Sequence, residues 1–191
     1  MSNNVTPDVT LFDGDDYLFK KYIKNCDIYF EYGVGKSTNY VIKNTKAKIV
    51  AVDSDKNWIE SINISKREKD IKLNWIDLGE LEDWGRPKTY SHRINFMDYI
   101  SVVWQFDTLL ADVILIDGRF RVACFLYCLL KSKEGSFIFF DDYTNRSYYH
   151  IVEDIIPIFD LCGRQAVFQV PKKFNRDEVN KLLDKFLYVF D

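Results

Sequence analysis

The sequence is poor in the residues that build metal sites and disulfide frameworks. Its 191 residues include two histidines and four cysteines, and no two cysteines form a Cys-x-x-Cys pair. Structural zinc sites take four Cys or His ligands, usually from closely spaced pairs. We therefore expect no zinc site. Cys124 and Cys128 stand one helical turn apart in an apolar stretch, and we expect them to be buried core residues.

A strong charge of one sign and long apolar runs are also missing. The formal net charge is −3, whereas a general nucleic-acid binder usually has a basic face. No apolar run approaches the roughly 20 residues that span a bilayer. Residues 1–16 are polar and acidic, unlike a signal peptide. We expect a cytoplasmic protein with neither nucleic acid nor membrane as its partner.

What is present is a globular composition, with 47% hydrophobic and 16% aromatic residues. Short apolar segments alternate with segments that have helical character. The expected strands are 27–32, 48–52, 72–76, 112–116, 136–140 and 165–170. The expected helices are 37–44, 57–66, 120–130, 148–159 and 178–187. Apolar strands separated by helices indicate a doubly wound α/β fold, with a mostly parallel sheet covered by helices on both faces. We expect one domain over residues 1–191, with an N-terminal helical segment at 1–26 and a long loop at 78–111.

Acidic residues stand at or next to the ends of five expected strands. They are Glu31, Asp53, Asp77, Asp117 and the pair Asp141 and Asp142. Asp is also a common turn residue and helix N-cap, which accounts for one or two of these positions better than for five. In open α/β sheets the ligand crevice lies outside the carboxyl ends of the strands. The acids therefore predict a ligand site at that edge.

The stretch "YFEYGVGKSTNY" at 29–40 has some of the letters of a nucleoside-triphosphate P-loop. A P-loop, G-x-x-x-x-G-K-[ST], would need its first glycine at position 30, which is Phe30. Glu31 would also point a carboxylate at a triphosphate. We therefore do not expect a P-loop.

The same stretch fits an adenosine-bearing cofactor better. Gly33 and Gly35 let the backbone turn tightly and approach a ligand. Ser37 or Thr38 can cap the following helix, whose N-terminal amides favour an anionic group. Asp53 follows Gly33 by 20 residues, where an acid can accept hydrogen bonds from both ribose hydroxyls.

These motifs resemble those of the class I S-adenosylmethionine-dependent methyltransferases, and more narrowly those of small bacterial methyltransferase-like proteins. The segments behind the resemblance are EYGVGKST at 31–38, WGRP at 84–87, IDGRFR at 116–121 and FDDY at 140–143. The resemblance implies a Rossmann-like fold and S-adenosylmethionine as cofactor.

The resemblance also implies cofactor-binding roles for Glu31, Gly33, Gly35, Ser37, Thr38, Asp53 and Asp77. Asp77 would meet the adenine amino group, and Ser37 stands where the family has its third glycine. Glu31 would lie near the cationic end of the cofactor; the alternative is a hydrogen-bond anchor for the glycine turn.

The resemblance also implies an acceptor side after the fourth and fifth strands. Asp117 would act there as a base or metal ligand. Arg119 would bind an anionic acceptor through its planar fork, or else form a structural ion pair. Asp142 and His150 complete the expected catalytic group, although His150 could instead have a capping or surface role.

Metal use is a separate question. In metal-dependent O-methyltransferases, acids after strands four and five hold magnesium, and Asp117, Asp141 and Asp142 resemble that arrangement. Arg119 and Arg121 bring competing positive charge, which disfavours a cation. Magnesium is therefore only an optional second cofactor. The loop at 78–111, with Trp84, is expected to be a lid or substrate wall, or else an ordinary surface excursion.

These observations predict an S-adenosylmethionine-dependent methyltransferase. The expected reaction is O-methylation of a small polar or anionic acceptor such as a sugar or polyol. The alternative is a non-catalytic module that binds an adenosine cofactor and retains the fold. A nicotinamide-dependent oxidoreductase is disfavoured, because the third glycine of its fingerprint is missing.

Overall fold

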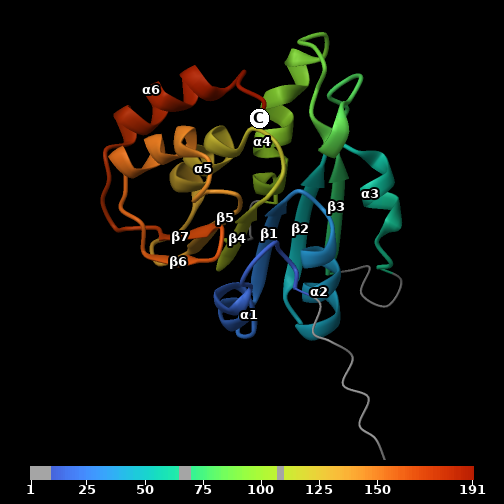
Figure 1. Ribbon diagram of the computed structural model, residues 1–191, viewed down its shortest axis with the longest axis vertical. Coiled ribbons are helices and arrows are strands. Elements are labelled where there is room, and N and C mark those ends of the chain that lie inside the picture. The colour runs from blue at the N-terminus through green and yellow to red at the C-terminus, as the bar shows by residue number, and fades with distance from the viewer. Residues whose placement is uncertain (1–9, 65–69, 107–109) are drawn as a thin grey trace, which may run out of the picture.

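The computed structural model describes residues 10–64, 70–106 and 110–191. Its centre is a seven-stranded sheet in the order β3-β2-β1-β4-β5-β7-β6 (Figure 1). The strands are β1 (Ile28–Tyr32), β2 (Lys48–Asp53), β3 (Ile71–Trp75), β4 (Val113–Ile116), β5 (Phe137–Phe140), β6 (Asp160–Cys162) and β7 (Gln165–Gln169). Strands β1 to β5 are parallel, and β7 is antiparallel to both β5 and β6. The predicted doubly wound, mostly parallel α/β fold is confirmed.

Helices cover both faces of this sheet. They are α1 (Tyr17–Ile23), α2 (Lys36–Asn44), α3 (Lys56–Ser61), α4 (Phe96–Ser101), α5 (Arg121–Lys131) and α6 (Arg176–Phe186). Short 3-10 helices lie at Asp83–Gly85, Arg93–Asn95, Val102–Trp104 and Ser147–Asp154. Residues of α1, α2 and α3 pack with one set of strand residues, and residues of α4, α5 and α6 pack with the other set. Because alternate strand residues point to opposite faces, Tyr29 belongs to the first core and Phe30 to the second.

All four cysteines are buried and unpaired. This confirms that Cys124 and Cys128 are core residues, and both lie on α5 in the core beneath α4 and α6. No helix in the described ranges is both long enough and apolar enough to cross a bilayer.

The C-terminal part of the sheet differs from the sequence prediction. The expected helix at 148–159 is a 3-10 helix that ends at Asp154, and the unpredicted strand β6 begins at Asp160. Pro157 lies between them. Proline lacks an N–H donor and disfavours helical geometry in the residue before it, so the helix cannot continue into the strand.

Two other expectations are only partly matched. The expected helix at 57–66 is α3, which ends at Ser61, and residues 65–69 lie outside the described ranges. Of the N-terminal segment, residues 1–9 also lie outside them, and α1 accounts for the helix. The connection at 78–111 is not a continuous loop, because it includes α4 and three 3-10 helices.

The strand order reverses between β1 and β4, and this reversal gathers the loops that matter. Tyr32 at the end of β1 is in register with Val52 and with Ile116. The chain is held just beyond these ends as well: the Gly33 amide donates to the Val52 carbonyl at 2.9 Å, and the Asp117 amide to the Tyr32 carbonyl at 2.8 Å. Ligands of open α/β sheets bind at such a reversal point.

Candidate functional site

A cleft of about 650 Å³ opens at this edge of the sheet. The loops after β1, β2, β4 and β5 line it, together with residues 11–13, the turn at 83–86 and Asp191. Of the predicted site residues, it brings together Gly33, Gly35, Ser37, Asp53, Asp117, Arg119 and Asp142. Glu31, Thr38, Asp77 and His150 are not among the residues that line it.

The two glycines of the turn after β1 have different surroundings. Gly33 has φ +94°, and a Cβ there would lie 2.8 Å from the backbone of Asp117 and of Gly118. The close approach at Gly33 is therefore to the chain itself. At Gly35 a Cβ would have nothing within 4 Å. Because Gly35 lines the cleft, its missing side chain leaves space for a ligand.

Glu31 lies behind this turn rather than in the cleft. It is completely buried, and its Oε1 accepts a hydrogen bond from the Ser37 hydroxyl. Thr38 Oγ1 accepts from the Gly35 amide at 2.9 Å. Burial raises the pKa of Glu31 to about 7, although the hydrogen bond from Ser37 opposes this. These contacts match the anchoring alternative for Glu31, and they fix the start of α2.

Asp53 reaches the cleft from the end of β2. Its Oδ2 accepts from the Val34 amide at 2.7 Å and its Oδ1 from the Asp55 amide at 2.8 Å. Burial raises the pKa of Asp53, while these backbone donors lower it. A carboxylate oxygen has two lone pairs, so each oxygen can accept one further hydrogen bond from a ligand hydroxyl.

Two predicted residues are turned elsewhere. Asp77 Oδ1 accepts from the Gly79 amide at 2.9 Å, and its other oxygen lies 3.6 Å from His92 Nε2. His150 stacks on Tyr143, with ring centroids 4.8 Å apart, and its Nε2 lies 3.1 Å from the Tyr143 carbonyl oxygen. The structure thus gives both residues local partners outside the cleft.

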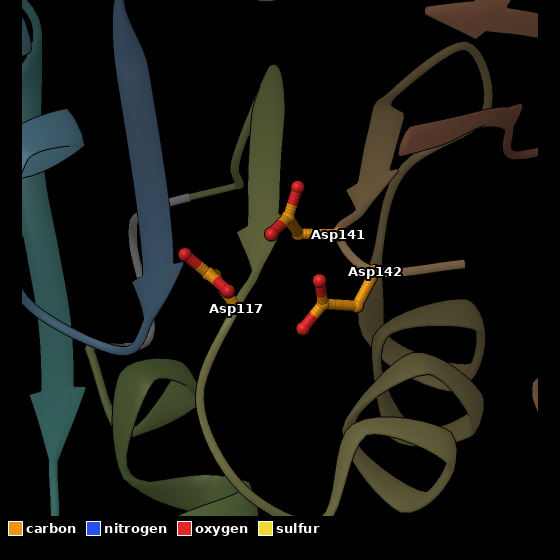
Figure 2. Close-up of side chains that lie close together, drawn as sticks. All are labelled: Asp117, Asp141 and Asp142. Atoms are coloured by element: carbon orange, nitrogen blue, oxygen red, sulfur yellow. The ribbon is translucent and has the colours of Figure 1, made fainter. Parts of the chain in front are cut away.

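The three aspartates after β4 and β5 do come together. Figure 2 shows the side chains of Asp117, Asp141 and Asp142 close together beside the ends of β4 and β5. One oxygen from each lies within 4.8 Å of the others. Asp142 has φ +57°, an uncommon conformation for a non-glycine residue. Strain of this kind often marks a functional site.

Three arginines already occupy this acidic cluster. Arg121 lies 3.2 Å from Asp117 and 3.3 Å from Asp142. Arg146 lies 2.8 Å from Asp142, and Arg164 contacts Asp141 and also lies 3.1 Å from Asp142. Three carboxylates and three guanidiniums have no net charge. Magnesium requires several free oxygen ligands and excess negative charge, so the residues present do not fit a magnesium ion.

Asp117 is the most exposed acid of this cluster. Its side chain is 29% exposed, against 10% for Asp142 and 0% for Asp141. Burial raises the pKa of Asp117 above its ordinary range, the Asp141 carboxylate raises it further, and Arg121 opposes both. A carboxylate with a raised pKa is a stronger base than usual.

Several lining residues were not predicted from the sequence. Among them are Tyr99, Arg146, Arg164 and Asp191. Trp84 and Arg86 belong to the WGRP segment that we expected to form a lid or substrate wall, and both line the cleft. The Ser54 hydroxyl donates to the Gly85 carbonyl at 2.7 Å and so attaches this turn to the end of β2.

Comparisons with known proteins agree with this geometry. No protein-family model matches the chain, and no curated protein matches it. Among solved structures, the chain is similar to a methyltransferase-like protein from Silicibacter pomeroyi, with 26% identity and a TM-score of 0.82 over 95% of this chain and 97% of that one. It also shares its fold with an O-methyltransferase from Bacillus cereus in complex with SAH, with 14% identity and a TM-score of 0.56 over 86% and 83% of the two chains. The strand order, the glycine turn and the likeness over 95% of the chain together support the class I S-adenosylmethionine-dependent methyltransferase superfamily.

Proposed function

We propose that this protein is an S-adenosylmethionine-dependent methyltransferase that acts on a small polar or anionic acceptor. The observation behind the proposal is the position of one cleft between the glycine turn, Asp53 and Asp117 at the reversal point of the sheet. S-adenosylmethionine supplies an electrophilic methyl group on a sulfonium sulfur. The protein therefore needs to position two molecules, exclude water and remove one proton.

The cofactor side of the cleft is built from the turn after β1 and the end of β2. The open space at Gly35 admits a ligand close to the backbone. The start of α2 offers amide groups to a carboxylate. Asp53 has acceptor capacity left for ribose hydroxyls. The exposed ring of Trp84, at 82% exposure, stands at the rim and is available for stacking on a base.

The acceptor side is built from the loops after β4 and β5. Asp117 would accept the proton of an acceptor hydroxyl at a carboxylate oxygen. Arg121, 3.2 Å away, would hold this carboxylate in place. This arrangement supports O-methylation without a metal, because the cluster's oxygens are already bound by arginines.

A non-catalytic cofactor-binding module remains the second candidate. It is favoured by one observation, the neutralisation of Asp141 and Asp142 by arginines. Methyl transfer from isotopically labelled S-adenosylmethionine to a panel of hydroxy compounds separates the two candidates. Labelled product supports the enzyme; cofactor binding without product from the whole panel supports the module.

Calorimetry tests the cofactor itself. We expect S-adenosylmethionine and S-adenosylhomocysteine to bind, and ATP and NAD to bind much more weakly. Equal affinity for ATP would contradict the proposal. We also propose a cytoplasmic location, which the four free thiols support, since disulfides are rare in reducing compartments.

A further inference from the structure

Arg119 differs from every other arginine in the cleft. Its guanidinium is buried, with 8% of the residue exposed. Its Nη1 donates to the main-chain oxygen of Asp191, and its Nε has no hydrogen-bond partner. In the part of the chain that the structure describes, no ion pair joins Arg119 to a carboxylate. A buried guanidinium nitrogen without a hydrogen-bond partner is costly.

The other arginines of the cleft are bound by carboxylates. Arg121, Arg146 and Arg164 are bound by the three aspartates after β4 and β5. Arg86, at the rim, lies 2.8 Å from Glu82. Arg119 therefore has a guanidinium nitrogen that no carboxylate of the cleft binds, and it stands on the acceptor side, two residues after Asp117.

The last residues of the chain reach this position. Phe190 packs in an aromatic cluster, with ring centroids 4.8 Å from Tyr90 and 5.8 Å from Phe96. This packing places Asp191 next to Arg119, and Asp191 Oδ1 accepts from the Arg121 amide at 3.3 Å. Figure 1 shows this end of the chain beside α4, where the red segment after α6 returns to the carboxyl edge of the sheet.

We infer that Arg119 is the binding site for a carboxylate of the methyl acceptor, and that residues 188–191 occupy this site within the chain. The first half deepens the proposed function and rests on it. A guanidinium offers two parallel N–H donors to a carboxylate, and the free Nε of Arg119 belongs to such a pair. Within the chain, the main-chain oxygen of Asp191 uses a different donor, Nη1, and leaves Nε without a partner.

The test compares acids with their neutral amides by calorimetry at saturating S-adenosylhomocysteine. Benzoate, lactate and malonate are paired with benzamide, lactamide and malonamide. At least one acid should bind about tenfold tighter than its amide, since hydrogen bonds to charged groups are the stronger ones. Arg119→Gln should abolish the difference, whereas Arg119→Lys, which keeps the charge, should retain part of it.

Lys36→Gln is the matched control, because Lys36 lines the cofactor side of the same cleft. It should leave the acid-to-amide difference unchanged. Equal binding of acids and amides by the wild type, or an unchanged difference in a folded Arg119→Gln protein, overturns the assignment of Arg119.

The segment 188–191 has its own test. Phe190→Ala removes its aromatic anchor, and Asp191→Ala removes its acid. The double variant should bind the preferred acid about three- to tenfold tighter. A segment that occupies the site leaves it free for the acid only part of the time, and the apparent affinity is reduced by that fraction. Unchanged or weaker binding in a folded double variant overturns the occupation of the site by this segment.

A carboxylate could also come from the cofactor, so two further ligands separate the sources. S-adenosylhomocysteine has a carboxylate, and 5′-methylthioadenosine lacks it. If Arg119→Gln weakens the first tenfold and leaves the second unchanged, Arg119 serves the cofactor and the acceptor assignment is wrong. If neither ligand binds the wild type, the proposed function itself fails. If S-adenosylhomocysteine and 5′-methylthioadenosine both bind but the acids do not, the assignment of Arg119 fails and the proposed function stands.

Discussion

The guanidinium of Arg164 binds both carboxylate oxygens of Asp141, with Nε 3.2 Å from Oδ1 and Nη2 on Oδ2. Asp141 has no exposed surface and directly follows β5, whereas Arg164 comes from the turn between β6 and β7. The pair fixes this hairpin to the floor of the cleft. It also occupies an acid that a metal ion would need.

Magnesium should therefore not bind this cluster. Titration of the protein with millimolar magnesium chloride should give no binding heat, and methyl transfer should be unaffected by a chelator. The physical reason is that arginines would have to leave before the carboxylates could bind a cation. If a chelator abolished methyl transfer and added magnesium restored it, the prediction would be wrong, and the ion pairs would have to open during the reaction.

The two glycines of the turn should respond differently to alanine. Gly33→Ala should lower the free energy of unfolding by about 1–3 kcal/mol, because a positive φ and a close backbone contact both oppose a Cβ. Gly35→Ala should leave stability nearly unchanged and weaken S-adenosylhomocysteine binding, because its Cβ would enter open space in the cleft. Urea unfolding and calorimetry measure the two effects. The reverse pattern would show that the roles of the two glycines have been exchanged.

Glu31 should make stability depend on pH. Its pKa is raised to about 7 in the folded protein, so the folded state holds the proton more tightly than the unfolded state. The stabilisation is complete below the unfolded value and is lost as pH rises toward 7. The stability of Glu31→Gln relative to the wild type should then increase by about 2–3 kcal/mol between pH 5 and pH 8.

Urea unfolding at both pH values measures this change. Glu134→Gln, at an exposed position, is the control and should show little pH dependence of its own. A Glu31→Gln protein whose relative stability is the same at pH 5 and pH 8 would mean that Glu31 titrates normally.

Asp117→Asn should act on the reaction rather than on cofactor binding. Turnover should fall about 10²- to 10⁴-fold, the range for loss of a general base, while S-adenosylhomocysteine affinity stays within a few-fold. Because the pKa of Asp117 is raised, wild-type turnover should increase with pH as this group loses its proton. The residual activity of the variant should lack that increase. Rates and affinities come from labelled methyl transfer and calorimetry.

The parts of the fold predicted from the sequence are those with a strong local signal. Five apolar segments with acids at or next to their ends became the parallel strands, and Gly33 and Gly35 formed the expected turn. Strand β6 has three residues and two of them are exposed, so it has no apolar run to detect. Helix α4 has six residues, too few for a helical period to be clear.

The site was predicted less completely because its ion pairs join distant parts of the chain. Arg164 binds Asp141 over 23 positions, and Arg119 meets Asp191 over 72. No local pattern reveals such partners. Asp77 has the expected position at a strand end, but its side chain binds the Gly79 amide instead of turning to the cleft. The position of a residue relative to a strand end predicted its place in the fold. It predicted the direction of the side chain less well.

The most direct test of the central claim is calorimetry of S-adenosylhomocysteine with the wild type and with Asp53→Ala. The wild type should bind, and the variant should lose about 1–3 kcal/mol of binding free energy, the range for hydrogen bonds to a charged group. Gel filtration and thermal melting should show that the variant is folded, since Asp53 also binds the Val34 amide. A wild type that binds ATP or NAD as tightly as S-adenosylhomocysteine, or a folded variant with unchanged affinity, would contradict the account.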